Sequence, residues 1–365
     1  MNAERFAERR RRVTEAADAA GLSGLLVSPG PDLAYLTGHI PPPLERLTLL
    51  ILTVGRDPVL VVPALERPSA EDAPGSSGLE ILDWRDADDP YRLVAKVLPS
   101  GRYAMTDQTW ASHLLALDLA TADCLFVAAG TTLPLLRAVK DADEVERLRS
   151  AARAADAAFA EVAGLPFGGR TELEIAGELE RLLRSHGHQR VDFTIVGSGP
   201  NSASPHHGSG ARTIERGDAV VMDFGGVLDD YCSDITRTVV VGEPTEELRR
   251  VYDVVRAAQQ AAFEVVRPGV AAQEVDRAAR AIIVEAGYGD RFVHRTGHGI
   301  GLEIHEPPYI VEGNTTPLEA GMTFSDEPGI YLERRFGVRI EDQVVVTPEG
   351  GERLNEASRD LTIVG

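Results

Sequence analysis

Four aspartates lie in one segment that is otherwise patterned like two β-strands. The segment VMDFGGVLDDYCSDITRT, residues 221–238, contains Asp223, Asp229, Asp230 and Asp234. Aspartate is depleted in strands and common in turns. Any fold of this chain must therefore place each of these acids in a turn or supply a partner for its charge.

We expect a β-hairpin here, with strands at 219–224 and 231–240 and a two-residue turn at 228–229. In this register Asp223 lies directly opposite Asp234, with Cβ atoms about 4.5–5.5 Å apart on one face. Like charges so placed destabilise a sheet unless a cation lies between them. The other two aspartates then belong to the turn and its edge. The hairpin predicts a positive group between Asp223 and Asp234.

The length of the chain predicts two domains, because 365 residues exceed one ordinary core. Strand patterns at 22–28, 47–53 and 58–63 alternate with helical patterns around 2–20, 90–98 and 132–139. This alternation predicts an α/β domain. A long helical pattern follows at 139–164, with acids in its first turn. We place the boundary before that helix, giving domains at 1–138 and 139–365.

The second domain contains a faint internal repeat. Residues 166–187 overlie residues 268–289 at an offset of 102, and each copy reads as a Pro/Gly turn, a helix and a glycine stop. Thr171 and Glu174 form a capping-box pattern at the first of these helices. The repeat predicts a pseudo-two-fold α+β domain with a site between its halves.

Composition and charge argue against several classes of protein. The chain is 43% apolar and 26% charged and has no apolar run near 18 residues, which argues against disorder and membrane spans. Its net charge is -20, with 39 acidic and 23 basic side chains after residue 140, which argues against nucleic-acid binding. Two cysteines give no disulfide framework, and the N-terminus has no secretory apolar stretch. We expect a cytoplasmic protein that binds neither nucleic acid nor membranes.

Three later motifs supply further polar side chains. RTGHGIGLEIHEPP (295–308) contains His298 and His305, and FSDEPGIY (324–331) contains Glu327. FGVRIEDQVVVT (336–347) is patterned like one strand, in which Glu341 is an acid among apolar residues and Arg339 lies on the same face. Each of these residues alone has an ordinary structural explanation. Taken together, they suggest one site: a single dinuclear metal site would explain why two aspartates, one histidine and two glutamates occur in these motifs and in the segment 221–238.

Charge counting favours that hypothesis. Four carboxylates gathered in a partly buried cleft repel one another and become protonated unless cations neutralise them. Carboxylates with one imidazole and no thiolate suit Mn²⁺, Co²⁺, Zn²⁺ or Fe²⁺, and we expect two ions, with Mn²⁺ first. Two such ions about 3.5–4 Å apart can share a water and lower its pKa.

These motifs, together with GPNSASPHHG (199–208), resemble the motifs of the metallopeptidases of the pita-bread fold. They also follow one another along the chain in the same order as in that family. That family includes Xaa-Pro dipeptidase (prolidase), aminopeptidase P and methionine aminopeptidase. The first domain is similar in layout to the N-terminal domain of creatinase and prolidase. The resemblance implies a dinuclear-metal Xaa-Pro peptidase that acts on proline-containing dipeptides or short peptides, and we expect a homodimer.

The resemblance also implies a role for individual residues. Asp223 would bind one metal, Asp234 and Glu341 would bridge both, and His298 and Glu327 would bind the other. Glu327 would also act as the general base. Three further residues would complete the catalytic machinery: His206 and His305 beside the scissile carbonyl, and Arg339, which would orient the acids.

One position departs from the resemblance. Dipeptide-selective prolidases often carry an arginine shortly after the histidine-glutamate pair, where it can pair with the free carboxylate of a dipeptide. This chain has Tyr309 there. Tyrosine carries no charge, so the sequence predicts that longer Xaa-Pro peptides are accepted about as well as dipeptides.

Other activities remain as alternatives. A methionine aminopeptidase uses the same ligands, but the N-terminal domain and the HEPP segment favour the proline-directed branch. Creatinase-type hydrolases lack the metal set that is intact here. A non-catalytic peptide-binding module and a hydrolase of small amides are further alternatives, because a fold does not fix a substrate.

Overall fold

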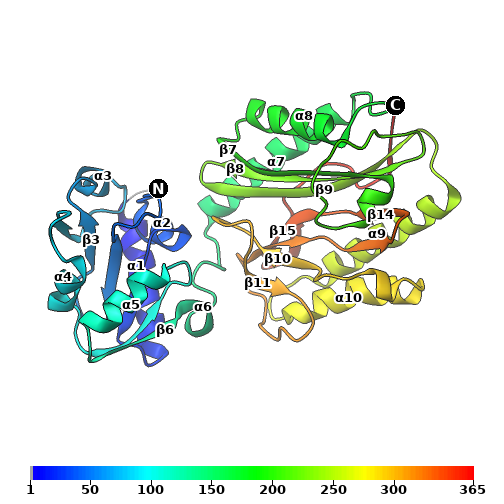
Figure 1. Ribbon diagram of the computed structural model, residues 1–365. Helices are drawn as coiled ribbons and strands as arrows, with labels where there is room; N and C mark the ends of the chain where they lie inside the picture. Colours follow the sequence, from blue (N-terminus) through cyan, green and yellow to red (C-terminus); the bar gives the residue numbers. More distant parts are fainter. Residues whose placement is uncertain (1–2) are drawn as a thin grey trace. The chain divides into compact units, whose positions relative to one another are not determined.

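The computed structural model describes residues 3–365, and the chain divides into two compact units, Met1–Arg137 and Ala138–Gly365 (Figure 1). Each unit has a buried apolar core of its own, the first around Leu26 and Tyr103 and the second around Phe224 and Ile235. The polar site described below lies wholly within the second unit.

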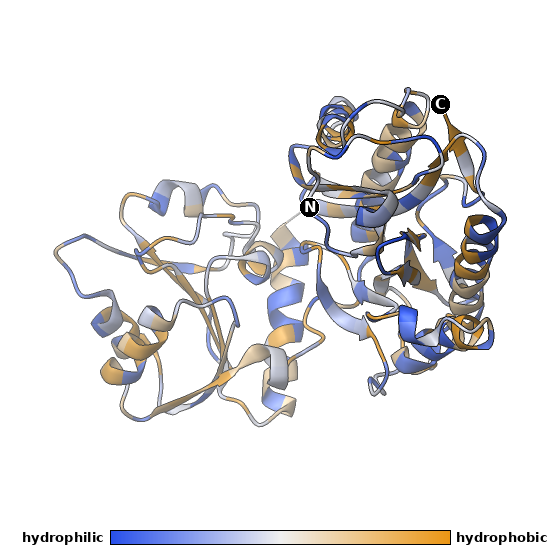
Figure 2. Ribbon diagram, turned by 45° about the vertical axis from the view of Figure 1, so that its right-hand side comes forward, coloured by the Kyte–Doolittle hydropathy of each residue, from blue (hydrophilic) through white to orange (hydrophobic). Residues whose placement is uncertain are grey.

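The first unit is built on a six-stranded mixed sheet with the order β4-β3-β2-β1-β5-β6. Its strands are β1 (Gly24–Val27), β2 (Leu49–Thr53), β3 (Val59–Pro63), β4 (Glu80–Trp84), β5 (Gly101–Met105) and β6 (Cys124–Ala128). Its helices are α1 (Ala3–Ala19), α2 (Pro31–Thr37), α3 (Arg67–Glu71), α4 (Pro90–Val97), α5 (Ala111–Ala120) and α6 (Ala129–Thr132). The central strands β1 and β2 are buried along their whole length, and they carry the hydrophobic colours in Figure 2.

The predicted elements of this unit are confirmed with one exception. The three predicted strands are β1, β2 and β3, and the helices predicted around 2–20 and 90–98 are α1 and α4. The helix predicted around 132–139 is wrong, because the chain leaves the short α6 at once and continues in turns. Pro134 has no amide hydrogen for a helix interior, and Val139 forms an isolated β-bridge with Met322 instead.

The second unit consists of two similar layers of helix and sheet. The predicted long helix is α7 (Ala142–Val162), which begins with a capping box between Asp141 and Glu144. Helices α7 and α8 (Glu172–Ser185) pack against the sheet β17-β9-β8-β7, and α9 (Glu246–Val265) and α10 (Ala272–Glu285) pack against each other beside the sheet β11-β10-β12-β15-β16 (Figure 1).

The strands of this unit are mostly antiparallel. They are β7 (Arg190–Ser198), β8 (Ala219–Leu228), β9 (Tyr231–Val241), β10 (Gly297–Gly299), β11 (Glu306–Ile310), β12 (Thr323–Asp326), β13 (Gly329–Leu332), β14 (Phe336–Arg339), β15 (Asp342–Thr347), β16 (Gly350–Arg353) and β17 (Thr362–Val364). Only β17 pairs parallel, with β9, and β13 and β14 form a separate two-stranded hairpin. The segment 336–347, expected as one strand, is therefore two strands, and the break between them lies at Ile340 and Glu341.

The internal repeat is present, but its offset is 100 rather than 102. Helices α8 and α10 are each 14 residues long and begin at positions 172 and 272. The glycines that need positive φ correspond at the same offset, namely Gly169 with Gly269 and Gly187 with Gly287. An offset of 102 pairs Gly187 with Gly289, which does not have the positive φ that Gly187 and Gly287 share.

The hairpin forms as predicted, but its register is shifted. Strand β8 pairs with β9 so that Asp223 faces Thr236 and Asp234 faces Gly225, which makes the two acids diagonal neighbours on one face. The turn residues are Asp229 and Asp230, with φ of 50° and 71°. Aspartate tolerates this left-handed conformation better than leucine. The turn therefore lies at 229–230, one residue later than the predicted turn at 228–229.

Candidate active site

A cavity of about 440 Å³ in the second unit brings together every side chain predicted to act. Its walls come from both halves of the unit, including β8, β9 and β10. The lining residues that the sequence predicted are Asp223, Asp234, His298, Glu327, Glu341, His206, His305 and Arg339. The cavity also includes apolar wall from Phe193, Ile195 and Ile304.

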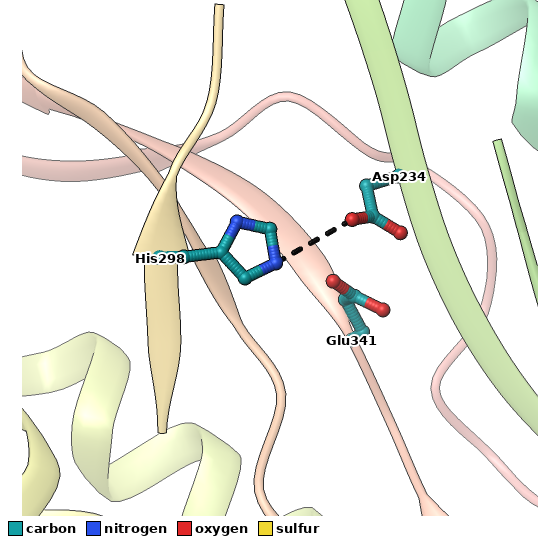
Figure 3. A group of neighbouring side chains, drawn as sticks. All are labelled: Asp234, His298 and Glu341. Carbon is teal, nitrogen blue, oxygen red and sulfur yellow. Dashed lines mark ion pairs between the residues drawn. The ribbon is translucent and has the colours of Figure 1, made fainter. Parts of the chain in front are cut away.

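Three of these side chains form a compact cluster. Asp234, His298 and Glu341 each offer one ligand atom, and these atoms lie within 4.8 Å of one another (Figure 3). His298 Nε2 lies 3.6 Å from Asp234 Oδ2 and 3.4 Å from Glu327 Oε1. This geometry places four potential donors around one small volume.

Close packing of β10 holds the histidine in this cluster. A Cβ atom on Gly297 would lie 1.7 Å from the carbonyl oxygen of Ser325, so only glycine allows this approach of β10 to β12. The amide of His298 donates to Ser325 Oγ at 3.0 Å, and its Nδ1 lies 3.2 Å from the carbonyl oxygen of Gly299. Nδ1 is thereby occupied, which leaves Nε2 to face the acids.

Unpartnered oxygens on the acids point to a cation. Asp223 Oδ1, Asp234 Oδ1 and Glu341 Oε1 are buried and have no hydrogen-bond partner among residues 3–365. A buried carboxylate oxygen without a partner costs free energy, which divalent cations would recover. The donor set of carboxylates and one imidazole fits such ions, so the residues present suit a divalent metal.

The acids also resist ionisation in the absence of a cation. Burial, followed by the charges of Glu341, Asp223 and Glu327, raises the pKa of Asp234 well above its usual range. Burial raises the pKa of Glu327 to about 7 even though Arg339 opposes the shift. Burial and the neighbouring His305 lower the pKa of His298 to about 3, so its imidazole is neutral and able to ligate.

Arg339 organises two of the acids. Its guanidinium donates to Asp223 Oδ2 at 2.5 Å and to Thr236 Oγ1 at 3.0 Å. Thr236 in turn donates to Glu341 Oε2 at 2.7 Å. Because these contacts fix one oxygen of Asp223 and one of Glu341, the second oxygen of each acid is left to face the cavity.

The two remaining predicted histidines border the cluster. The rings of His305 and His298 lie edge to face with centroids 4.0 Å apart. Desolvation by the cavity wall and the charge of Arg295 lower the pKa of His305, although its side chain reaches solvent. His206 enters from the loop after β7 and is exposed at the cavity wall.

We expect His305→Ala to keep its metal ions and to lose about 10² or more in kcat. The reason is that His305 lies beside the cluster without belonging to it, and one preorganised donor to a developing oxyanion is worth about this much. Metal content and kcat should be measured at saturating metal. A purified variant that had lost its metal but regained wild-type kcat at saturating metal would instead make His305 a ligand.

Sequence reasoning missed His294, Tyr331 and Arg295. His294 Nε2 accepts from the Tyr331 hydroxyl at 2.8 Å, and that hydroxyl accepts from Arg339 at 3.0 Å. His294 Nδ1 donates to the carbonyl oxygen of Arg295 at 2.7 Å. The signal available was the HRTGH spacing, which puts a second histidine four residues before His298.

The two-fold arrangement of helices and sheets around a cleft of carboxylates and imidazoles defines a pita-bread metallopeptidase. The chain matches metallopeptidase family M24 over residues 146–348 and the creatinase/prolidase N-terminal domain over residues 9–139. It therefore belongs to metallopeptidase family M24, and the resemblance and fold class expected from the sequence are confirmed.

Relatives match over nearly the whole chain. A protein of Mycobacterium tuberculosis named "Probable dipeptidase PepE" is 45% identical over 100% of this chain and 98% of its own length. The Xaa-Pro dipeptidase of Lactobacillus helveticus is 38% identical over 91% of this chain and 92% of its own length. The crystal structure of dipeptidase PepE from Mycobacterium ulcerans superposes with a TM-score of 0.95 at 44% identity, covering 100% of this chain and 99% of that one.

A further structural relative is the prolidase of Thermococcus sibiricus, with a TM-score of 0.92 at 37% identity and complete coverage of both chains. Separately, none of the helices in residues 3–365 combines the length and the apolar character that crossing a bilayer requires.

Proposed function

We propose that this protein is a metal-dependent Xaa-Pro dipeptidase that holds two divalent ions between Asp223, Asp234, His298, Glu327 and Glu341. The observation that carries the proposal is that Asp223, Asp234 and Glu341 each have a buried oxygen with no hydrogen-bond partner among residues 3–365, and that all three acids line one cavity. Membership of family M24 and the names of the full-length relatives support the reaction class.

The residues of the cavity divide the chemistry among them. When bound, the metal ions would neutralise the carboxylates and activate a water for attack on the peptide carbonyl. Glu327, which lines the cavity beside His298, would accept a proton from the attacking water and pass it to the imide nitrogen. His305 and His206 would donate hydrogen bonds to the oxygen that becomes negative. The network of Arg339 would keep the acids in place.

Mn²⁺ is the ion we propose, because the donors are mainly hard oxygens, and Co²⁺, Zn²⁺ and Fe²⁺ suit the same donors. The cytoplasmic location and the homodimer expected from the sequence remain predictions. Proline-containing dipeptides are the proposed substrates in preference to longer peptides, because the guanidinium of Arg295 lies beside Tyr309.

Arg295 supplies the charge that Tyr309 lacks. Its guanidinium lies 4.4 Å from the centroid of the Tyr309 ring and lines the cavity. It has no hydrogen-bond or ion-pair partner within the part of the chain that the structure describes. The relaxed length selectivity predicted from Tyr309 assumed that no cation stood at this place. We therefore propose that Arg295 pairs with the free carboxylate of a dipeptide.

We expect Arg295→Ala to lower kcat/KM for an Xaa-Pro dipeptide about tenfold or more, mainly through KM, because a charged hydrogen bond is worth about 1.5–3 kcal/mol. The C-terminal amide of the same dipeptide should lose little, since it has no carboxylate. The exposed Arg291 nearby is the matched control, and Arg291→Ala should resemble the wild type. An equal loss for acid and amide substrates would assign the carboxylate to another group.

The proposed function is tested by one assay of the metal-supplemented protein against four substrates. These are an Xaa-Pro dipeptide, the matching Xaa-Pro-Yaa tripeptide, a Met-Xaa dipeptide without proline and a small non-peptide amide. We expect the Xaa-Pro dipeptide to have the highest kcat/KM. A preference for the Met-Xaa peptide or the amide would select one of the alternative activities.

A further inference from the structure

Glu172 is a fully buried carboxylate at the first position of α8, outside the metal cluster. Its Oε1 accepts from the amide and hydroxyl of Ser198 at 2.8 and 2.7 Å and from Asn201 Nδ2 at 3.0 Å. Its Oε2 accepts from His207 Nε2 at 2.8 Å and from the amide of Gly210 at 3.2 Å. One carboxylate therefore binds five donors that all belong to the segment 198–210.

That segment carries His206 into the cavity. Among the described residues, the imidazole of His206 has no hydrogen-bond partner of its own, and its side chain is exposed. Its position is therefore set by the backbone on either side of it. His207, the next residue, is one of the donors to Glu172, so the carboxylate acts within one peptide bond of His206.

The other side of His206 is tied to the acid cluster. Arg339 Nη1 lies 3.4 Å from the carbonyl oxygen of Pro205, and the same guanidinium pairs with Asp223. Residues 205–207 are thus held between Arg339 and Glu172. Glu172 and Arg339 therefore make the contacts on either side of His206, while Ser202 and Ser209 tie the segment to Gly337 and Val196.

A buried helix carboxylate also binds a segment of the site in the other half of the unit. Asp276 of α10 is fully buried, and its Oδ1 accepts from the amide and hydroxyl of Thr296 at 3.0 and 2.8 Å. Thr296 lies two residues before His298. Asp276 is not equivalent to Glu172 under the offset of 100. Even so, in both halves a buried helix carboxylate binds the backbone close to a histidine of the site.

We propose that Glu172 is a positioning residue for the reaction, which fixes His206 against the substrate carbonyl by clamping the segment 198–210. This inference rests on the proposed function, because it assigns His206 a part in hydrolysis. A histidine displaced by about 1 Å loses roughly 10² in rate. Because Glu172 does not contact the acid cluster, its loss should spare the metal ions.

The test compares Glu172→Gln with Glu174→Gln in the metal-loaded full chain. Glutamine keeps the volume but loses the charge and one acceptor oxygen. Glu174 is the matched control, because it caps the same helix through Thr171 and makes no hydrogen bond to the segment 198–210. We expect Glu172→Gln to lower kcat about 10- to 100-fold with KM within about threefold, and Glu174→Gln to change neither.

His207 provides a second pair of variants in case Glu172→Gln fails to fold. His207→Ala removes the donor nearest His206, whereas His207→Gln keeps an amide donor of similar reach. We expect the alanine variant to lose kcat about tenfold and the glutamine variant to recover most of it. Equal activity of the two variants would contradict the clamp.

A double-mutant comparison separates positioning from general stability. In a His206→Ala background, Glu172→Gln should lower kcat by less than about threefold, because the group that it positions is gone. A full 10- to 100-fold loss in that background, or loss of metal from the single variant, would overturn the proposal and make Glu172 purely structural.

Hydrogen exchange of the segment 198–210 gives a readout that does not depend on activity. We expect faster exchange in Glu172→Gln than in the wild type and in Glu174→Gln. Unchanged exchange would show that the clamp is absent. If the wild-type protein failed to cleave Xaa-Pro substrates, the proposed function would fall, while the exchange data would still decide whether the clamp exists.

Discussion

Asp234→Asn is expected to lower kcat/KM by about 10³ or more and to reduce the bound metal, while the fold survives. The aspartate is buried, and one of its oxygens has no hydrogen-bond partner in the described chain. The other oxygen lies 3.6 Å from His298 Nε2. An amide supplies no negative charge to a cation, and metal ions contribute several kcal/mol to such reactions. Turnover and metal content should be measured on the same preparation.

Asp229→Asn is the matched control. Asp229 is in the same hairpin but occupies the turn with φ of 50°, a conformation that asparagine also tolerates. We expect its activity and metal content to equal those of the wild type. If Asp234→Asn retained two metal ions and wild-type turnover, Asp234 would not be a ligand.

Glu327→Gln is expected to lower kcat by about 10³ or more, through loss of a metal ligand and of the general base together. Its carboxyl lies 3.4 Å from His298 Nε2 and accepts from Ser325 Oγ at 3.2 Å. Burial raises its pKa to about 7 while no cation is bound, and a bound cation lowers that pKa, so the carboxylate is ionised and able to accept a proton. Glutamine keeps the shape and cannot accept that proton. The measurement is kcat across pH 5 to 9 at saturating metal.

The control for this variant is Glu333→Gln, since Glu333 is an exposed acid in the turn that follows β13. We expect its pH profile to match the wild type. A Glu327→Gln enzyme with an unchanged profile would require another base, and His294 and His305 would be the next residues to replace.

Much of the site was predictable from the sequence, because acids in strand-like segments are costly and need an explanation. Asp223, Asp234 and Glu341 stood out for this reason, and the structure brings all three to one cavity. The hairpin itself was predictable from its two apolar strands. Its register was not, because it depends on which pair of residues takes positive φ, and Asp229 with Asp230 does so at lower cost than Leu228.

Contacts between distant segments could not be predicted in the same way. Glu172 is one of two acids in the first turn of α8, and only the folded chain brings the segment 198–210 to it. Arg295 preceded a glycine-rich motif, and its position over Tyr309 follows from the pairing of β10 with β11. In both cases the partner lies at least ten residues away, so no local pattern carried the signal.

The central claim is that two metal ions held by this cluster are required to hydrolyse an Xaa-Pro bond. The most direct test is to remove metal from the full chain with a chelator, add Mn²⁺ in steps, and follow Ala-Pro hydrolysis. We predict negligible hydrolysis without metal and a rate that reaches its plateau at two equivalents per chain. Full activity in the metal-free protein, or a plateau at one equivalent or fewer, would contradict the claim.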